Sequence, residues 1–508
     1  MLHILLLIVF TLFLASFFLS GDRSRRLPPG PKGWPLLGNL PQLGPKPHQT
    51  LHSLSKFYGP VLRLRFGAVD VAVASSAAVA ENFLRVHDSN FSSRPPSSGA
   101  KHIAYNCQDL VFAPHGERWR TLRRMCALHL FSGRALERFR HVRAGEVARM
   151  VRGLAAASSP EGTVAGVDVG GMVNACAANA LGLAVVGRRV FDDADCGAEE
   201  FEGMVVELMK VAGVFNVGDF VPCLDWLDLQ GVVAKMKKLH RRFDEFLDKL
   251  IAEHRALTNE RDMLSMMIRL KKEEEEEEDR NGGMLTDTNI KALLLNLFTA
   301  GTDTTSSTVE WALAQLIREP GLLFKAQNEL DSVVGRARLV SESDLPNLPF
   351  LQSVVKETFR LHPPTPLSLP RIAAADCEVD GYLIRRGSTL LVNVYAIGRD
   401  PASWPDEPLA FRPERFLSGG RNEGVDVKGN DFELIPFGAG RRICVGMSLG
   451  LRMVQLMTAT LVHAFEWRLP EGEVPEEMEM EEEFGLTLRR AQPLVACPLP
   501  RLAPEAYL

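Results

Sequence analysis

One cysteine stands in a loop that is suited to hold a reactive thiolate. Residues 436–446 contain three glycines, which let the backbone turn tightly and approach a ligand closely. Cys444 lies just before a predicted helix that begins at Met447, where the helix-start amides and the charge of Arg442 stabilise a thiolate. Such a thiolate could be a nucleophile or a metal ligand, but a nucleophile needs a nearby base and the loop contains no histidine. Taken alone, the cysteine could equally be a packing residue.

A second polar cluster interrupts the most apolar helix of the sequence. This helix is expected over residues 288–318, where Pro320 ends it, and its apolar start at residues 292–298 predicts burial. Gly301, Asp303 and Thr304 are costly choices for a core helix, and such violations often mark function. A glycine and a threonine can open the backbone ladder and leave a groove for a small ligand. A satisfied polar kink is the alternative.

Two pairs of residues have helical spacing. Glu357 and Arg360 are three apart and share a helix face. Trp119 and Arg123 are four apart and also share a face. On an exposed surface the Glu–Arg pair would contribute only a few tenths of a kcal/mol. Each pair is a weak signal by itself, because such spacings occur by chance in long helices.

The elements that must position these residues are mostly helices. Residues 61–66 and 69–73 predict a β-hairpin, and Ser75 or Ser76 can cap a helix that runs to about residue 85. Helical periodicity or long helix-forming stretches cover residues 132–154, 231–257, 291–318, 321–334, 348–361 and 447–465. Short strand-like pieces occur at residues 377–382, 389–394 and 484–488. We expect a mainly α fold with small β-sheets and no internal repeat.

Composition excludes several classes of protein. The 508 residues include 41 glycines and 31 prolines, too few for a low-complexity chain, and the 46% hydrophobic and 24% charged content is that of a globular protein. The net charge of −5 gives no case for a nucleic-acid partner. None of the eight cysteines has CxxC spacing, so neither a zinc site nor a dithiol motif is indicated. The glutamate run at residues 273–278 predicts a mobile surface loop, with a functional acidic tail as the alternative.

The N-terminal residues predict a membrane anchor. Residues 2–20 carry no charge, and as a helix they would reach about 28 Å, close to the hydrocarbon thickness of a bilayer. The arginines at residues 23, 25 and 26 follow the apolar run and would stay on the cytoplasmic side. A cleaved signal peptide is the alternative. We expect an anchor at residues 1–21 and then a basic, Pro-rich hinge at residues 22–45.

Four segments, taken together and in order, resemble the cytochrome P-450 superfamily. Residues 437–446 have the form Phe-x-x-Gly-x-Arg-x-Cys-x-Gly of its haem-binding loop, and residues 300–305 resemble its oxygen-activation motif. Residues 357–360 match its Glu-x-x-Arg element, and residues 411–416 match its Pro-Glu-Arg-Phe element. The resemblance covers essentially the whole chain. It implies the P-450 fold, with a single haem domain at residues 46–508 in place of the three domains that the length alone suggests.

The resemblance also implies a role for each residue. Cys444 would be the axial ligand of a haem b iron, and Asp303 and Thr304 would pass protons to bound dioxygen. Glu357 and Arg360 would join Arg415 in a buried network that holds the fold around the haem loop. The residues implied to bind the cofactor, including its propionates, are Arg94, Trp119, Arg123, Arg371, Phe437, Arg442 and Cys444.

The implied reaction is monooxygenation of an organic substrate with dioxygen. The chain shows no flavin or dinucleotide fingerprint, so NADPH would act through a separate cytochrome P-450 reductase. Basic residues around Arg120, Arg124 and Arg441 could receive its acidic face, with ordinary solvated charge as the alternative. The implied location is the endoplasmic reticulum membrane, with a single pass through the lipid and a cytosolic catalytic domain.

Longer segments narrow the substrate. Residues 354–371, 425–435, 215–220 and 226–231 are similar to plant flavonoid 3'-monooxygenases, which hydroxylate the B-ring of flavanones, dihydroflavonols, flavonols or flavones. Thr305, Val445 and the glutamate run depart from that pattern without removing a required chemical group. By the same resemblance the pocket would be lined from residues 101–110, 204–220, 296–304, 365–369 and 484–486.

Other activities remain open at this level. Sister flavonoid 3',5'-hydroxylases share most of these segments, and another phenylpropanoid hydroxylase is a further alternative. Intact Asp303 and Thr304 argue against a haem-thiolate isomerase or dehydratase that needs no reductase. Intact Cys444 and Glu357 argue against a catalytically silent membrane scaffold.

Overall fold

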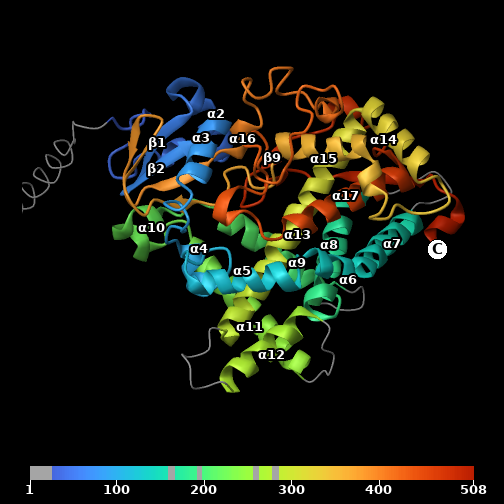
Figure 1. Cartoon of the computed structure of the whole chain (residues 1–508), viewed down its shortest axis with the longest axis horizontal. Coiled ribbons are helices and arrows are strands. Elements are labelled where there is room, and N and C mark those ends of the chain that lie inside the picture. The colour runs from blue at the N-terminus through green and yellow to red at the C-terminus, as the bar shows by residue number, and fades with distance from the viewer. Residues whose placement is uncertain (1–25, 158–165, 192–196, 256–261, 277–284) are drawn as a thin grey trace, which may run out of the picture.

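The computed structural model describes residues 26–157, 166–191, 197–255, 262–276 and 285–508. Most of these residues lie in helices, with short strands gathered into small sheets, which confirms the predicted fold class (Figure 1). The predicted anchor at residues 1–21 lies outside the described residues, as do residues 22–25 of the predicted hinge. The sheet of β1 and β2 lies at one side of the molecule, and the helices make up the rest (Figure 1).

Two kinds of helix occur in the described residues. The α-helices are α2 (Pro47–Tyr58), α3 (Ala77–Glu81), α4 (Ser98–His102), α5 (Glu117–His129), α6 (Gly133–Arg138), α7 (Arg140–Ala157), α8 (Val169–Val186), α9 (Gly197–Ala212), α10 (Val217–Phe220), α11 (Val232–Arg255), α12 (Met263–Glu276), α13 (Asp287–Arg318), α14 (Pro320–Val333), α15 (Pro349–Leu361), α16 (Val394–Ile397) and α17 (Met447–Ala464). The short helical turns are η1 (Leu40–Gln42), η2 (Asn82–Val86), η3 (Pro222–Leu227), η4 (Leu345–Asn347), η5 (Pro413–Phe416), η6 (Gly440–Arg442), η7 (Pro475–Glu477) and η8 (Pro504–Tyr507).

The strands form one four-stranded sheet and three smaller ones in the described residues. The largest sheet has the order β1-β2-β7-β4, in which β2 and β7 run parallel and the other neighbours run antiparallel. The remaining sheets have the orders β3-β11-β8, β5-β6 and β10-β9. The strands are β1 (Val61–Phe66), β2 (Val69–Ala74), β3 (Val167–Asp168), β4 (Arg371–Ile372), β5 (Cys377–Val379), β6 (Tyr382–Ile384), β7 (Thr389–Val392), β8 (Phe465–Arg468), β9 (Glu482–Glu483), β10 (Arg489–Arg490) and β11 (Val495–Pro500).

Most predicted elements are confirmed, and three differ. The predicted helix at residues 132–154 is two helices, α6 and α7, because Phe139 leaves the helical conformation (φ −96°, ψ 12°) and is buried at the bend. Residues 484–488 form the turn between β9 and β10 rather than a strand. Their backbone binds other parts of the chain: the Leu488 amide donates to the Pro364 carbonyl at 2.9 Å.

The glutamate run begins as helix and not as a loop. Residues 273–276 form the last turn of α12, and residues 277–284 lie outside the described residues. Arg269 and Glu273, one turn apart on this helix, form an ion pair at 3.6 Å. Such pairs stabilise a helix by a few tenths of a kcal/mol each, and this one helps the helix to continue into its acidic end.

Helix α13 crosses the middle of the molecule and is buried along most of its length (Figure 1). It packs against α8, the apolar helix on its flank. At their contact a Cβ on Gly301 would lie 2.7 Å from Leu181 Cδ2, so a larger residue there would require the Leu181 side chain to shift. Helix α8 is the one described helix long and apolar enough to cross a membrane, but 72% of it is buried inside the protein. We therefore assign it to the core.

The described part of the Pro-rich segment is attached to the sheets. The Arg63 amide of β1 donates to the Pro29 carbonyl at 2.8 Å, and the Leu383 amide of β6 donates to the Arg26 carbonyl at 2.9 Å. Residues 26–33 are not helical, as their prolines require. These bonds fix where the chain enters the domain.

The buried Glu–Arg network predicted from the sequence is present. Both oxygens of Glu357 accept from Arg360, each at 2.7 Å, and Glu357 Oε1 also accepts from Arg415 Nε at 3.1 Å. Arg360 uses its remaining donors on the carbonyls of Gly398 and Pro408, each at 2.6 Å, and of Ala410 at 2.9 Å. The side chains of Glu357 and Arg360 are 0% exposed, so their charges depend on each other. The network joins α15 to η5 and to the chain that leads to the cysteine loop.

Replacing Glu357 with Gln should destabilise the protein strongly. The substitution leaves two buried guanidinium groups without a counter-charge, which costs roughly 3–5 kcal/mol. The matched control is Glu137→Gln, since Glu137 pairs with Arg140 at the same i,i+3 spacing but is 64% exposed; its loss costs about 1 kcal/mol or less. Chemical denaturation of the haem-loaded variants measures both, and equal losses would contradict the structural role of the network.

Candidate active site

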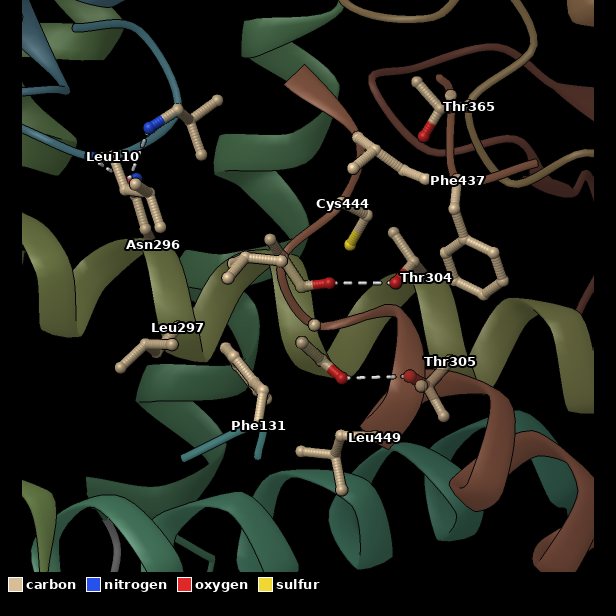
Figure 2. Close-up of a pocket in the computed structure, with 18 of the residues that line it drawn as sticks. Leu110, Phe131, Asn296, Leu297, Thr304, Thr305, Thr365, Phe437, Cys444 and Leu449 are labelled. Atoms are coloured by element: carbon tan, nitrogen blue, oxygen red, sulfur yellow. Dashed lines mark hydrogen bonds between the residues drawn. The ribbon is translucent and has the colours of Figure 1, made fainter. Parts of the chain in front are cut away.

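A buried cavity of about 290 Å³ lies between α13 and the loop that precedes α17. Figure 2 shows Cys444 and Phe437 on that loop and Thr304 and Thr305 on α13, at the two flanks of the cavity. Every residue that the sequence predicted to bind a cofactor lines this one cavity: Arg94, Trp119, Arg123, Arg371, Phe437, Arg442 and Cys444. Side chains that are 350 residues apart in the chain therefore meet at one site.

The cysteine loop is held in a shape that requires glycine. The Cys444 amide donates to the Phe437 carbonyl at 3.0 Å and closes the loop on itself. Gly440 has a φ of +68°, and a Cβ there would lie 2.4 Å from the Leu84 carbonyl oxygen. The next amide, that of Arg441, donates to the Asp88 carboxylate at 3.0 Å. The loop thus rests directly on the backbone of η2, with no room for a side chain at residue 440.

The Cys444 thiol faces the cavity from deep within the protein. The exposed surface of its side chain faces the cavity. Burial raises the pKa of the thiol, while hydrogen bonds from the amides of Gly446 and Met447 and the charge of Arg123 act in the opposite direction. The predicted help from the helix-start amides is confirmed. Arg123 is a cation that lowers the pKa of this sulfur, and the help expected from Arg442 stays a prediction.

Arg442 is occupied elsewhere. Its Nε donates to the Ser92 carbonyl at 2.6 Å, and its Nη2 donates to the Ala113 carbonyl at 2.5 Å. Its guanidinium lies 4.5 Å from the centre of the Trp119 ring, and that of Arg123 lies 5.5 Å from the same ring. The indole of Trp119 therefore lies within reach of both cations and helps to keep them at the cavity wall.

Three arginines gather positive charge at the cavity, and one of them, Arg371, is paired with Asp88 at 3.5 Å. Burial lowers the pKa of both Arg371 and Arg442 to about 10, and the pKa of Arg94 falls well below its usual value through burial and the charges of the other two. Most of their bonds are to carbonyls, such as that from Arg94 to Leu369 at 2.7 Å. Nη1 of Arg371 and Nη1 of Arg442 have no hydrogen-bond partner among the described residues. The cluster fits a ligand that carries two carboxylates.

The predicted acid and alcohol on α13 point to different places. Thr304 lines the cavity, and its hydroxyl donates to the Ala300 carbonyl at 2.8 Å. Asp303 is not among the described residues that line it; it is 1% exposed and forms an ion pair with Arg489 of β10. Its Oδ2 has no hydrogen-bond partner in the described part of the chain.

Helix α13 does not open at this point. It is continuous from residue 287 to residue 318, so the predicted break in its backbone ladder is wrong. The hydroxyls of Thr302 and Thr305 instead donate to the carbonyls one turn before them, at 2.7 and 3.0 Å. The groove comes from small side chains, since Ala300 and Gly301 are exposed to the cavity in an otherwise buried helix.

A second cavity of about 390 Å³ adjoins the first. Each of the five segments predicted to form the substrate pocket contributes to it: residues 101–110, 204–220, 296–304, 365–369 and 484–486. Its lining is mostly apolar and includes Phe215 and Phe484. Ala300, Thr304 and Thr365 line both cavities, so the two spaces meet above the exposed part of α13.

Asn296 and Asp109 lie in ranges predicted to line the pocket, but the sequence interpretation gave neither residue a role of its own. Asn296 Oδ1 accepts from the amides of Leu110 and Val111 at 3.0 and 3.1 Å, which ties the segment after α4 to α13 (Figure 2). Asp109 is 0% exposed, and burial raises its pKa to about 6. A polar amide within the apolar start of α13 was the available signal for Asn296. No sequence pattern marks Asp109. Its charge acts on Arg94 and Arg442, which only the fold brings near it.

The chain belongs to the cytochrome P-450 family, whose model matches residues 28–495. The family implies a haem iron with a thiolate ligand. The cavity fits this group, since it places an accessible sulfur opposite α13 and, at its wall, a guanidinium nitrogen of Arg442 that has no hydrogen-bond partner among the described residues. Cys444 would hold the iron, and Arg371 and Arg442 would hold the propionates.

Individual relatives match over the full length. A flavonoid 3'-monooxygenase of Crocosmia x crocosmiiflora is 63% identical, with 100% of both chains covered. A flavonoid 3'-monooxygenase of Arabidopsis thaliana is 59% identical over 100% of this chain and 98% of its own. A flavonoid 3',5'-hydroxylase of Crocosmia x crocosmiiflora is 54% identical over 99% and 96%. The resemblance seen in the sequence motifs is confirmed.

Replacing Cys444 with Ala should abolish the spectroscopic signature of the site. Without the sulfur the reduced protein loses the red-shifted Soret band of its carbon monoxide complex and all turnover. Cys223→Ala is the control, because Cys223 is exposed and does not line the cavity. A Cys444→Ala protein that keeps the band would contradict the ligand assignment.

Arg442→Gln should weaken haem retention while leaving the fold intact. Losing one charge-assisted contact to a carboxylate should raise the rate of haem transfer to an acceptor globin about tenfold. The neighbouring Arg441→Gln is the matched control, since Arg441 is 52% exposed and its side chain binds Asp88. Equal rates in the two variants would show that Arg442 does not hold the group.

Proposed function

We propose that the protein is a membrane-bound monooxygenase that hydroxylates the 3' position of the flavonoid B-ring. The observation that carries this is the full-length identity of 63% to a flavonoid 3'-monooxygenase. The geometry supports it, because a mostly apolar cavity opens onto the cysteine cavity at Ala300 and Thr304. An aromatic substrate in the second cavity would present one edge to the first.

The protein's own residues divide the work. Haem bound through Cys444 supplies the activation of dioxygen, by which one oxygen atom enters the substrate and the other leaves as water. Arg94, Arg371 and Arg442 supply the positive charge that two carboxylates need, and Trp119 and Phe437 pack beside the group. Thr304 holds a hydroxyl where the two cavities meet and can relay protons there. Asp303, the residue before it, is the proposed source of those protons.

The apolar wall of the second cavity suits a flat aromatic ligand. Leu208, Met209 and Phe215 come from the chain around α9, and Phe484 and Leu486 come from the β9–β10 turn. Cavities of a few hundred cubic ångströms with few polar groups hold ligands of this size. Hydroxyl and carbonyl groups on the substrate would provide the polar contacts.

The reaction needs two electrons, which we assign to NADPH through a cytochrome P-450 reductase. Arg120, Arg124 and Arg441 are all exposed, as a docking surface for an acidic partner requires. The proposed anchor at residues 1–21 would hold the enzyme in the endoplasmic reticulum membrane by a single pass, with residues 22–45 as the hinge. Residues 46–508 would then form the cytosolic catalytic domain, in contact with membrane lipid.

Hydroxylation at both 3' and 5' positions is the second candidate. A relative with this activity in its name is 54% identical over nearly the whole chain. The two activities differ only in whether the first product is accepted again.

Turnover in microsomes with a reductase separates the candidates. Naringenin, dihydrokaempferol, apigenin and a phenylpropanoid ester are offered in turn. We expect a single new hydroxyl at the 3' position of a flavonoid. A 3',5' product would favour the second candidate, and absence of flavonoid product from protein with an intact carbon monoxide spectrum would overturn both.

Asp303→Asn should slow turnover without loss of haem. The amide keeps the shape and removes the carboxylate, and general acid–base groups contribute about a hundredfold or more to such steps. Asp287→Asn is the control, because Asp287 lies on the same helix but is 47% exposed. Turnover rates of the two haem-loaded variants check this, and an unchanged rate for Asp303→Asn would contradict the proton-supply role.

A further inference from the structure

A buried carboxylate lies at the base of the turn that forms one wall of the second cavity. Glu482 of β9 is 7% exposed and precedes Phe484, which lines that cavity. Its Oε2 accepts from Gln49 Nε2 at 2.8 Å and lies 3.0 Å from His48 Nε2. Nothing in the haem site uses this group, so its burial needs another explanation.

Two histidines and an arginine surround the carboxylate. His362 Nδ1 lies 3.7 Å from Glu482 Oε1, and Arg399 Nη2 lies 4.0 Å from the same oxygen. Burial would raise the pKa of Glu482, but the nearby His362 and His48 and the charge of Arg399 bring it below its usual value. The carboxylate is therefore ionised and holds several chain segments at once.

The orientation of His362 follows from its neighbours. The Gln315 amide nitrogen lies 2.8 Å from His362 Nε2 and can only donate, so a neutral His362 carries its proton on Nδ1, the atom that faces Glu482. The His362 ring stacks on Trp311 of α13, with ring centres 3.9 Å apart. His362 begins the segment that continues to Thr365, which lines both cavities.

His48 transmits the contact to the cavity wall. Its ring stacks on Phe484 at 5.4 Å with an angle of 15°, and it meets Tyr395 edge-on at 4.7 Å. The His48 carbonyl accepts from Asn393 at 3.0 Å, so its backbone is fixed as well. Glu482 thus sets the ring of His48, and that ring supports Phe484 from behind.

The other end of the same turn is also fixed. Arg489 pairs with Asp303, and Ser307 donates to the Leu488 carbonyl at 2.7 Å. Contacts therefore hold residues 484–488 at both ends. A change at Glu482 should shift this cavity wall.

We propose that Glu482 is a positioning residue for the hydroxylation: through His48 and His362 it holds the Phe484 and Thr365 walls where they select and orient the substrate. This inference rests on the proposed function for its substrate but not for its geometry. The Glu482→Gln variant, which removes the charge and keeps the shape of the side chain, should therefore keep the haem site and lose substrate discrimination.

The test compares Glu482→Gln with Glu483→Gln in the haem-loaded, full-length protein. Glu483 is next on the same strand but is 42% exposed and pairs with Lys210 at the surface. For Glu482→Gln we expect a normal carbon monoxide spectrum, about a tenfold rise in the dissociation constant of naringenin from its Soret shift, and fewer hydroxylated products per NADPH. For Glu483→Gln we expect values within about twofold of the wild type.

Hydrogen exchange of residues 484–488 provides a readout that needs no substrate. We expect faster exchange in Glu482→Gln and no change in Glu483→Gln. An unchanged exchange rate and an unchanged dissociation constant in Glu482→Gln would overturn the inference. If the wild type hydroxylates no flavonoid while Glu482→Gln still exchanges faster, the proposed substrate is wrong and the positioning role stands.

A second variant covers the case in which Glu482→Gln does not fold, shown by a missing carbon monoxide spectrum. His48→Gln keeps a donor for Glu482 and removes the ring that supports Phe484. The same rise in exchange at residues 484–488 is expected. An exchange rate equal to that of the wild type would reject the pathway through His48.

Discussion

A thiolate in a buried cavity is the constraint on which the rest of the structure depends. Burial favours the neutral thiol, so the sulfur of Cys444 needs amides and a cation close by. The amides come from the start of α17, so that helix has to begin within three residues of the cysteine. The cation comes from α5, through Arg123. The cysteine loop rests on the backbone beside Leu84. That backbone leaves no space for a side chain at residue 440, so glycine stands there.

The protein contains two kinds of buried charged cluster, one that stabilises the fold and one that lies at the cavity. Around Glu357 every charged group finds a partner of opposite sign or a carbonyl, and the network is closed. Around Arg371 and Arg442 the positive charges repel each other; Arg371 is paired with Asp88 at 3.5 Å, but Nη1 of Arg442 has no hydrogen-bond partner among the described residues. A closed network stabilises the fold itself, whereas an open one holds its charge in readiness for a ligand.

Much of the fold and site could be predicted from local pattern. The β1–β2 hairpin and the helices α13, α15 and α17 follow from alternation, helical periodicity and proline stops, which act over a few residues. The residues predicted to bind the cofactor followed from the family resemblance, and the structure brings all seven to one cavity. Local pattern also predicted one long helix at residues 132–154, because nothing in the sequence marks the bend at Phe139.

The remaining differences arise from contacts between distant segments. The preference for a strand at residues 484–488 is outweighed by bonds to Pro364 and Met209, which lie far away in the sequence. Arg442 lies two residues before Cys444, yet its side chain donates to the carbonyls of Ser92 and Ala113. The side chain of Asp303 turns to Arg489, 186 positions later, a partner that no spacing rule indicates. Such pairings become visible only when the whole chain is folded.

The Asp303–Arg489 pair has a consequence for how this enzyme can change. One end of the β9–β10 turn, which lines the second cavity, is held by an ion pair to Asp303, the proposed proton source. A substitution that reshapes the turn therefore also disturbs that carboxylate. If Asp303 supplies the protons, selection for a new substrate would also act on the yield of product per electron, and the two properties would change together.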